Sequence, residues 1–306
     1  MFDLIIIGGG PAGVAAGVYA ARKRMRTVLL TKDIGGQSVN SATIENFIGH
    51  TLISGFDFSR VLEEQLRAQE GLDLRIGTLA KEIRPIAGGY EVVTSRDETL
   101  QTKYILFALG STYRRLEVPG EDTYEGKGIF YCSICDAPLM KGKDALVVGG
   151  GNSGLEAVLD LAPYAKSITL IDKLDVLRGD VVLQEKIAQH PHVSIRLHRA
   201  VQKFEGEQFL QKAVIQDIAS GVVEELSVSG AFISIGWVPN TKLVRELVDI
   251  DASGRIIVDH TTMQTSRPGI WAAGDCTDGR YHQINTAIGD GVNAALHIYD
   301  TLRLEQ

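Results

Sequence analysis

The strongest constraint on the fold is an internal repeat. The segment Asp3–Lys32, DLIIIGGGPAGVAAGVYAARKRMRTVLLTK, aligns without a gap with Asp144–Lys173, DALVVGGGNSGLEAVLDLAPYAKSITLIDK. Each copy has a β-branched run, a Gly-x-Gly-x-x-Gly turn, an apolar pattern of helix length and a second β-branched run. This order of elements is typical of the strand–helix–strand unit that opens a dinucleotide-binding fold. The sequence therefore predicts two such units.

The three glycines of each turn have different physical roles. The first makes the tight turn out of the strand, the second lets a pyrophosphate approach the backbone, and the third lets the helix pack on the strand. The helix N-terminus that follows favours an anion, because its N–H groups are free. One such motif is weak evidence, but two in matching context are much stronger. The predicted glycines are Gly8, Gly10 and Gly13 in the first turn and Gly149, Gly151 and Gly154 in the second.

Length and charge exclude several classes of protein. A chain of 306 residues has room for two domains with separate cores. The net charge of −7, without a Lys/Arg run, argues against a nucleic-acid partner. No apolar run approaches the roughly 20 residues needed to span a membrane. The opening MFDLIIIGGG lacks a basic leading segment and predicts a buried strand rather than a secretion signal. We therefore expect a cytoplasmic protein.

Cysteine usage favours redox chemistry. Cys132 and Cys135 form a Cys-x-x-Cys pair, which could be half a zinc site, a structural disulfide or a reversible redox couple. Three cysteines cannot make a four-cysteine zinc site, although their number allows a site of three cysteines and one histidine. The histidines show no ligand spacing beyond the weak His190-x-His192, so we expect no metal. In a reducing cytoplasm, such a pair beside a βαβ pattern favours a redox couple. Cys276 is expected to be a small packing residue.

Two short segments are candidate domain boundaries. Pro119–Gly120 in LEVPGED and Pro239–Asn240 in GWVPNTK combine residues that interrupt regular structure. The second dinucleotide unit lies between them. The sequence thus predicts that a second domain is inserted into the first.

The motifs resemble those of a known family. GGGPAG, GGQ at 35–37, IENFIG at 44–49, CSICD at 132–136, GGGNSG at 149–154 and GDCTDGRYHQINTAIGDG at 274–291 follow the order of the low-molecular-weight thioredoxin reductases. The resemblance covers essentially the whole chain. The run CDAPLMKGKDALVVGGGNSGLEA is even more similar to the flavoprotein component of alkyl hydroperoxide reductase. That protein has an additional thioredoxin-like N-terminal segment, which we expect this chain to lack.

The resemblance implies an α/β fold with two Rossmann-like, three-layer ββα domains, the second inserted in the first. It assigns residues 1–115 and 244–306 to an FAD-binding domain and residues 116–243 to an NAD(P)H-binding domain that carries the Cys-x-x-Cys pair. The family is usually homodimeric, so a homodimer is expected as well.

The resemblance also implies the residues that contact FAD. The first glycine turn would hold the pyrophosphate, Gln37 and Asn46 would lie beside the flavin, Asp275 would contact the ribityl–phosphate region, and Gln283 with Ile284 would sit at the flavin ring. The full set is Gly8, Gly10, Pro11, Ala12, Gly13, Thr31, Lys32, Gly35, Gly36, Gln37, Asn46, Ala108, Gly110, Gly274, Asp275, His282, Gln283 and Ile284. One departure is that Thr31, followed by Lys32, occupies the place where an acidic residue often binds the ribose.

For the nicotinamide cofactor, the implied set is Gly149, Gly151, Asn152, Ser153, Gly154, Asp172, Lys173 and Arg178. Asp172 ends the second strand of the repeat, where a carboxylate binds the ribose hydroxyls of NADH and repels the 2′-phosphate of NADPH. The basic residues Lys173 and Arg178 oppose this preference. NADPH-using relatives, however, have a more basic segment here, a His-Arg-Arg run. NADH is therefore favoured over NADPH.

The implied reaction passes electrons from NAD(P)H through FAD to the Cys132–Cys135 disulfide and then to a thioredoxin- or glutaredoxin-like protein. Cys135 would be the flavin-side sulfur, Cys132 would attack the partner disulfide, and Asp136 would transfer the proton. In members of this family, one domain rotates about the linkers, so that the nicotinamide and the disulfide reach the flavin in turn.

Other functions remain open at this point. A peroxide-forming NADH oxidase would not need the cysteine pair. A ferredoxin- or flavin-fed disulfide reductase usually has a degraded nicotinamide motif, whereas this one is intact. A ferredoxin–NADP reductase of this fold would lack the cysteines, and a flavoprotein that only senses redox state would show no turnover.

Overall fold

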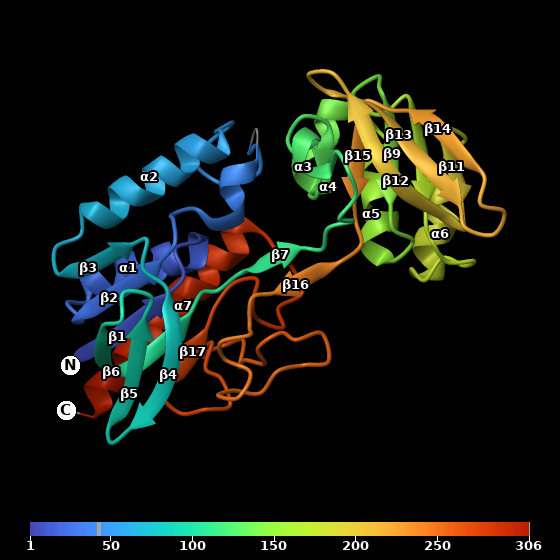
Figure 1. Cartoon of the computed structure of the whole chain (residues 1–306). Coiled ribbons are helices and arrows are strands. Elements are labelled where there is room, and N and C mark those ends of the chain that lie inside the picture. Colours follow the sequence, from blue (N-terminus) through green and yellow to red (C-terminus); the bar gives the residue numbers. More distant parts are fainter. Residues whose placement is uncertain (42–43, 306) are drawn as a thin grey trace. The chain divides into compact units, whose positions relative to one another are not determined.

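The computed structural model describes residues 1–41 and 44–305 (Figure 1). The chain forms two compact units, Met1–Thr112 with Val238–Gln306 (unit 1) and Tyr113–Trp237 (unit 2). Unit 2 is therefore an insertion between the two parts of unit 1. The strands that lead into and out of it, β7 (Ser111–Tyr113) and β16 (Trp237–Pro239), pair with each other in a two-stranded sheet.

The observed boundaries between the two units, after Thr112 and after Trp237, lie earlier in the chain than the boundaries predicted after residues 115 and 243. The predicted junction at Pro119–Gly120 is wrong, because this segment is packed inside unit 2. Its Pro119 carbonyl accepts a hydrogen bond from the Phe204 N–H at 2.9 Å. Gly120 has φ +89°, and a Cβ there would lie 2.2 Å from the Phe204 carbonyl oxygen. The glycine thus serves a tight turn within the unit rather than a link between units.

Unit 1 is built on a seven-stranded sheet in the order β3-β2-β1-β6-β5-β4, with β17 also paired to β6. Strands β1, β2, β3, β6 and β17 pair in parallel, whereas β4, β5 and β6 form an antiparallel extension. The strands are β1 (Phe2–Ile7), β2 (Thr27–Thr31), β3 (Leu72–Ile76), β4 (Ala80–Ile86), β5 (Gly89–Thr94), β6 (Thr99–Phe107) and β17 (Ile270–Ala272).

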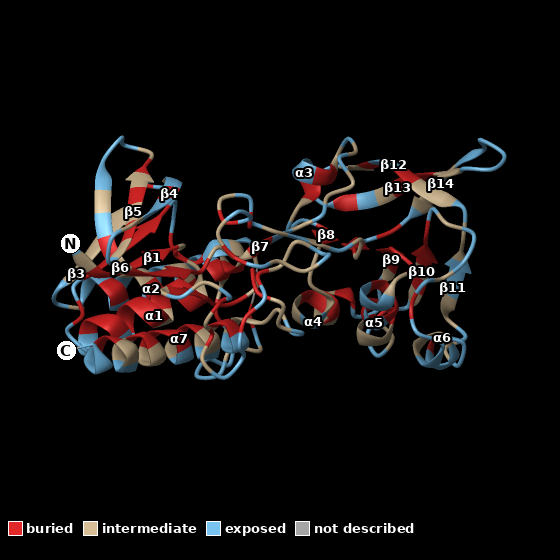
Figure 2. Cartoon of the chain, turned by 90° about the horizontal axis from the view of Figure 1, so that it is seen from below, coloured by how far each residue is buried: buried red, intermediate tan, exposed pale blue. Residues whose placement is uncertain are grey.

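The helices of unit 1 pack on this sheet and on one another. They are α1 (Pro11–Arg22), the 3-10 helix η1 (Gly36–Asn40), α2 (Gly55–Arg67) and α7 (Ile284–Leu304). Helices α1 and α7 lie side by side with buried faces (Figure 2). They approach so closely that a Cβ on Gly291 would lie 2.1 Å from the Ala12 carbonyl oxygen. This contact joins the C-terminal part of the chain to the first glycine turn.

Unit 2 contains a parallel sheet in the order β11-β10-β9-β15-β8 and an antiparallel sheet in the order β12-β13-β14. The parallel strands are β8 (Ile129–Phe130), β9 (Asp144–Val148), β10 (Ser167–Ile171), β11 (Val193–Arg196) and β15 (Gly230–Ile233). The antiparallel strands are β12 (Arg199–Gly206), β13 (Leu210–Asp217) and β14 (Val223–Ser227). The helices are α3 (Glu121–Tyr124), α4 (Ser133–Asp136), η2 (Ala137–Met140), α5 (Asn152–Leu161) and α6 (Val181–Ile187).

Two cores lie on opposite faces of the parallel sheet of unit 2. Because side chains alternate along a strand, Val147 of β9 packs with the helices, in the core that contains Leu155. Its neighbour Leu146 packs in the core that contains Ile215 of the antiparallel sheet. The unit is thus three layers, ββα, and the predicted fold class is confirmed.

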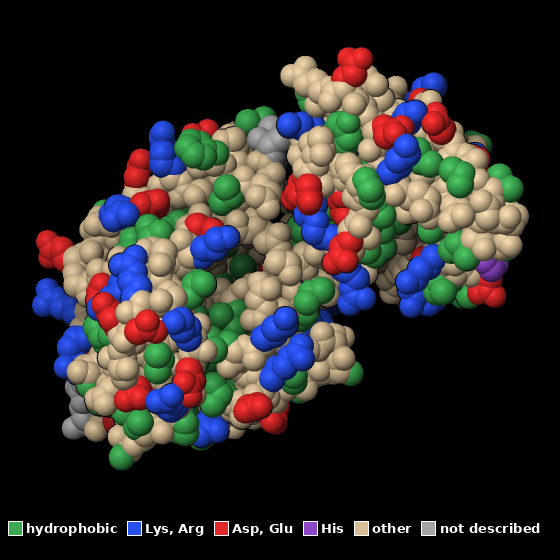
Figure 3. All heavy atoms as spheres, in the orientation of Figure 1, with side chains coloured by type: hydrophobic (Ala, Val, Ile, Leu, Met, Phe, Trp, Pro, Cys, Tyr) green, Lys and Arg blue, Asp and Glu red, His purple; other side chains and the backbone are tan. Residues whose placement is uncertain are grey.

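The repeat seen in the sequence corresponds to β1-α1-β2 in unit 1 and β9-α5-β10 in unit 2. Within residues 1–41 and 44–305, no helix is long and apolar enough to cross a membrane. Figure 3 shows Lys and Arg side chains interspersed with Asp and Glu over the visible face.

Candidate active site

The first glycine turn has the geometry that its sequence predicts. Gly8 has φ +118°, and a Cβ there would lie 2.1 Å from the Ala108 carbonyl oxygen. A Cβ on Gly13 would lie 1.9 Å from the Gly8 carbonyl oxygen, so helix and strand can meet only without a side chain. Gly10, in contrast, faces open space. It is the N-cap of α1, so no side chain caps the N–H groups at the start of this helix. The turn therefore presents free N–H groups to space that an anion could occupy.

Other predicted FAD residues gather around this turn in unit 1. Gly36 has φ +56° and lies against Gly10, since a Cβ on it would be 3.2 Å from the Gly10 Cα. A Cβ on Gly274 would lie 3.1 Å from the Cβ of Ala12. The Gln37 amide donates to the Ser111 carbonyl oxygen. Residues from both ends of the chain thus meet at the N-terminus of α1.

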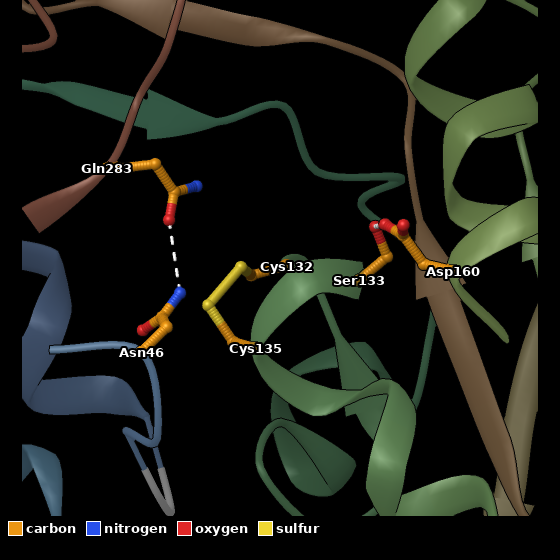
Figure 4. Close-up of a disulfide and its surroundings, with 6 residues drawn as sticks. All are labelled: Asn46, Cys132, Ser133, Cys135, Asp160 and Gln283. Carbon is orange, nitrogen blue, oxygen red and sulfur yellow. Dashed lines mark hydrogen bonds between the residues drawn. A yellow bond between two sulfur atoms is a disulfide. The ribbon is translucent and has the colours of Figure 1, made fainter. Parts of the chain in front are cut away.

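A polar pair connects two distant predicted residues. The Asn46 amide donates to the Gln283 side-chain oxygen at 3.1 Å (Figure 4). Gln283 also caps α7 in a reciprocal arrangement with Thr286, which places Ile284 at the first position of that helix. The pair links the segment after η1 to the start of α7.

Asp275, which follows Gly274, is a half-buried carboxyl group. Burial, with a smaller contribution from the Asp290 charge, raises the pKa of Asp275 to about 6. Burial chiefly, and then the Arg255 charge, lowers the pKa of His282. Cys276 is fully buried, and burial raises the pKa of its thiol to about 11, in line with a packing residue.

The end of β2 has Thr31 where many dinucleotide-binding folds have an acidic residue that binds the ribose hydroxyls. The buried Thr31 hydroxyl donates to the Asp33 carbonyl oxygen at 2.6 Å, and Lys32 is exposed. Two of the predicted glycines have left-handed backbone conformations, Gly35 with φ +100° and Gly110 with φ +62°. In this structure, Thr31 therefore stabilises the turn after the strand.

The second glycine turn, in unit 2, repeats the geometry of the first. Gly149 has φ +126°, and a Cβ on it would lie 2.3 Å from the Ser234 carbonyl oxygen. A Cβ on Gly154 would lie 1.7 Å from the Gly149 carbonyl oxygen, whereas Gly151 faces open space. Helix α5 follows directly, with Gly151 as its N-cap and without a side-chain cap. This turn also fits a pyrophosphate.

Asp172 is anchored at the base of this turn. The buried carboxylate accepts from the Gly150 N–H and, at 2.8 Å, from the Leu174 N–H. A carboxylate has about four lone-pair sites, so two bonds leave acceptor capacity. The Arg178 N–H donates to the Gly150 carbonyl oxygen at 2.8 Å, and the side chains of Lys173 and Arg178 are exposed.

One contact that the sequence did not predict joins the start of α5 to Asp180, the residue that directly precedes α6. The Asn152 side chain accepts from the Asp180 N–H at 2.7 Å and donates to the Asp180 carboxylate at 3.1 Å. Asn152 and the exposed Ser153 occupy the first turn of the helix. An Asp-Asn pairing across 28 residues has no local signal, so only the fold could identify it.

Cys132 and Cys135 form a disulfide at the start of α4, with their Cα atoms 5.3 Å apart (Figure 4). The Asp136 N–H donates to the Cys132 carbonyl oxygen at 3.1 Å. Between the cysteines, the Ser133 hydroxyl donates to the Asp160 carboxylate on α5 at 2.7 Å. The pair is therefore a closed disulfide that is held by the helix packed behind it.

Asp136 is the titratable group next to this disulfide. Only 6% of it is exposed, and its Oδ1 has no hydrogen-bond partner within the described part of the chain. Burial raises the pKa of Asp136 to about 7. A carboxyl group with such a pKa can both hold and release a proton near neutral pH.

Comparison with known proteins identifies the family. The model of the family described as pyridine nucleotide-disulphide oxidoreductase matches residues 2–291, and the chain belongs to this family.

Three relatives illustrate the similarity. An alkyl hydroperoxide reductase component of Staphylococcus epidermidis is 37% identical over 98% of this chain, and a protein named NADH dehydrogenase of Bacillus subtilis is 36% identical over 98%. The chain spans 59% and 58% of the lengths of these two relatives. The thioredoxin reductase of Streptococcus pyogenes has a solved structure with a TM-score of 0.92 and 34% identity, and the match covers 99% of both chains. The expected family resemblance is thereby confirmed.

Proposed function

We propose that the enzyme passes electrons from NADH through FAD and the Cys132–Cys135 disulfide to the disulfide of a thioredoxin- or glutaredoxin-like protein. Unit 1 is the FAD-binding domain, and unit 2 binds the nicotinamide cofactor and carries the disulfide. The observation that carries this proposal is the presence of two glycine turns of the same geometry in separate units, one of which also holds a disulfide.

FAD, when bound, accepts electrons as a pair from the nicotinamide and donates them as a pair to a disulfide. In unit 1, Gly10 and the N–H groups at the start of α1 would hold its pyrophosphate. Gln37 and the Asn46–Gln283 pair would supply polar contacts beside the flavin. The half-buried Asp275 would accept hydrogen bonds from hydroxyl groups of the ribityl chain. Gly151 and the start of α5 would hold the nicotinamide dinucleotide in unit 2.

The chemistry of the chain itself begins with the reduced cysteine pair. The Cys132 thiolate attacks one sulfur of the partner disulfide, so a mixed disulfide forms and the partner's other sulfur leaves as a thiolate. Cys135 then attacks Cys132, which restores the protein disulfide and releases the second partner thiolate. Asp136 exchanges a proton with the cysteine pair, for which its raised pKa suits it.

The preference for NADH rests on Asp172. Its carboxylate is fixed by two backbone N–H groups and keeps acceptor capacity for ribose hydroxyls. The same negative charge would repel the 2′-phosphate of NADPH. The name of the B. subtilis relative refers to NADH as well.

The two half-reactions need different groups of unit 2 at the flavin. The proposal therefore includes a reorientation of unit 2 about the strands that lead into and out of it, β7 and β16. It also includes a homodimer and a cytoplasmic location, which the family resemblance and the reducing environment needed by a dithiol support.

Steady-state assays with NADH and purified redoxins test this function. Turnover is expected with a thioredoxin- or glutaredoxin-like protein and is expected to disappear in the Cys132→Ser variant. Oxygen consumption that equals NADH consumption and survives the loss of both cysteines would instead identify an oxidase. Faster reduction by ferredoxin than by NADH would identify the ferredoxin-fed alternative.

A further inference from the structure

Three aromatic rings connect the redox segment of unit 2 to the two strands that lead into and out of it. Tyr131, which directly precedes Cys132, stacks on Tyr113 of β7 with ring centroids 5.0 Å apart and planes at 23°. Tyr113 in turn packs on Trp237 of β16, with centroids 3.9 Å apart. Each of the two strands thus contributes one ring, and the redox segment contributes the third.

The Tyr131 hydroxyl adds a second anchor. It donates to the Glu121 carboxylate at 2.8 Å. Glu121 is only 1% exposed and also accepts from the Leu116 and Glu117 N–H groups at 3.0 and 2.8 Å. Burial, together with the bond to Glu121, raises the pKa of the Tyr131 phenol, which therefore remains a proton donor.

Arg115 also contacts the Tyr131 ring. Its guanidinium lies 5.3 Å from the centre of the Tyr131 ring and pairs with Glu125 and Asp122 at 2.8 and 2.7 Å. Tyr131 is thus held by a hydrogen bond, a stacked ring and a cation. These contacts hold one residue that lies between a two-residue strand and a four-residue helix.

We propose that Tyr131 is a positioning residue for the redox disulfide, which fixes the Cys132 backbone to β7 and β16. The inference rests on the proposed role of the Cys132–Cys135 pair as the redox couple. A fixed Cys132 keeps its sulfur within reach of Cys135, where the Cα separation of 5.3 Å suits a disulfide. A looser segment lowers the effective concentration of one thiol at the other.

The consequence is a change in the thiol–disulfide equilibrium. In that reaction, two glutathione thiols reduce the protein disulfide, which gives two protein thiols and one glutathione disulfide, with two electrons transferred. Tyr131→Leu removes the hydrogen bond and the stack, and should make the disulfide about tenfold easier to reduce, a rise of about 30 mV in potential. Tyr131→Phe keeps the ring but removes the hydrogen bond, and should shift the equilibrium about threefold.

Two more variants complete the test. Trp237→Leu removes the far ring while it leaves the Tyr131–Glu121 bond in place, and a shift of about threefold is expected. Tyr124→Phe is the matched control, because this buried phenol belongs to the same unit but donates to the Gly206 carbonyl oxygen at 2.6 Å. Its equilibrium should stay within about twofold of the unaltered protein, since this hydrogen bond goes to Gly206 and holds neither Tyr131 nor a cysteine.

The measurement is the fraction of reduced Cys132–Cys135 in glutathione buffers of known ratio, read by acid quenching and thiol alkylation of the flavin-loaded protein. Unchanged equilibria in Tyr131→Phe and Trp237→Leu, or an equal shift in Tyr124→Phe, would overturn the proposal. Tyr131→Phe carries the test if Tyr131→Leu does not fold. The readout needs no turnover, so a shift in a protein that reduces no redoxin would overturn the proposed function but not this inference.

Discussion

The carboxylate of Asp172 accepts a hydrogen bond from the backbone N–H of Gly150, inside the glycine turn of unit 2. The residue that we expect to select NADH is thereby part of the turn that we expect to hold the pyrophosphate. Cofactor selection and phosphate binding therefore depend on the same few atoms.

The first prediction is that Asp172→Asn lowers kcat/KM for NADH by roughly tenfold and narrows the preference over NADPH. Each charge-assisted bond to a ribose hydroxyl is worth about 1.5–3 kcal/mol, and about 1.4 kcal/mol corresponds to tenfold. The measurement is kcat/KM for both cofactors. Asp175→Asn, at an exposed position of the same loop, is the control and should leave the ratio unchanged. A ratio that does not move in Asp172→Asn would show that the exposed Lys173 and Arg178 govern the site.

The second prediction separates the two half-reactions. Cys135→Ser should abolish the reduction of protein disulfides but leave the reduction of FAD by NADH largely intact, because hydride transfer uses no cysteine. Stopped-flow absorbance of the flavin and a steady-state redoxin assay give the two rates. Cys276→Ala, in the core of unit 1, should leave both rates in place. Equal loss of both rates in a folded, flavin-loaded Cys135→Ser protein would contradict the scheme.

The third prediction concerns the proton. Asp136→Asn should lower the rate of redoxin reduction by about a hundredfold, the range expected when a general acid–base group is lost. The pH dependence with an apparent pKa near the value of about 7 for Asp136 should disappear with it. Asp160→Asn, which alters the carboxylate bonded to Ser133, should keep that dependence. A pH profile that is the same in Asp136→Asn and the unaltered protein would exclude Asp136 from proton transfer.

The fourth prediction is that Asp136 lowers the stability of the folded protein as the pH rises. The folded-state pKa of Asp136 is about 7, above the ordinary value of 3.8, so the folded state favours the protonated carboxyl. Stability is therefore greatest below about pH 4 as far as this group is concerned, falls as the pH rises towards about 7, and is lowest above it. Asp136→Asn should raise the melting temperature at about pH 8 by more than at about pH 5. An equal gain at the two pH values, measured by thermal unfolding of the flavin-loaded protein, would mean that the pKa of Asp136 is not raised in the folded state.

The fifth prediction tests the glycine turn of unit 1. Gly10→Ala should fold but lose FAD affinity, because its Cβ would enter open space where the pyrophosphate binds. Gly8→Ala should fail to fold stably, because Gly8 has φ +118° and its Cβ would lie 2.1 Å from the Ala108 carbonyl oxygen. Flavin content and circular dichroism distinguish these outcomes. A Gly10→Ala protein that retains flavin as tightly as the unaltered chain would place the pyrophosphate elsewhere.

Local patterns in the sequence predicted the parts of the fold that depend on short segments. The conformation of Gly8 and Gly149 follows from the strand–turn–helix context, because only glycine adopts these positive φ values without strain. The doubled βαβ unit followed from the repeat itself. The closed Cys132–Cys135 pair agrees with the redox couple that the Cys-x-x-Cys spacing favours.

Contacts between distant segments could not be predicted in the same way. The Asn152–Asp180 pairing and the Tyr131–Glu121 bond each join the first residue of a helix to a loop, and tertiary packing decides their approach. The unit boundary was misplaced at Pro119–Gly120 because proline and glycine mark a turn without indicating whether that turn lies within a domain or between two.

In the proposed function, electrons from NADH reach the Cys132–Cys135 disulfide through the flavin. Anaerobic titration with NADH, followed by thiol alkylation and mass mapping, tests it most directly. We expect NADH to bleach the flavin and to convert Cys132 and Cys135 to thiols, so that the protein takes up two NADH per chain. A protein that takes up only one NADH, with its flavin reduced and the disulfide intact, would contradict it.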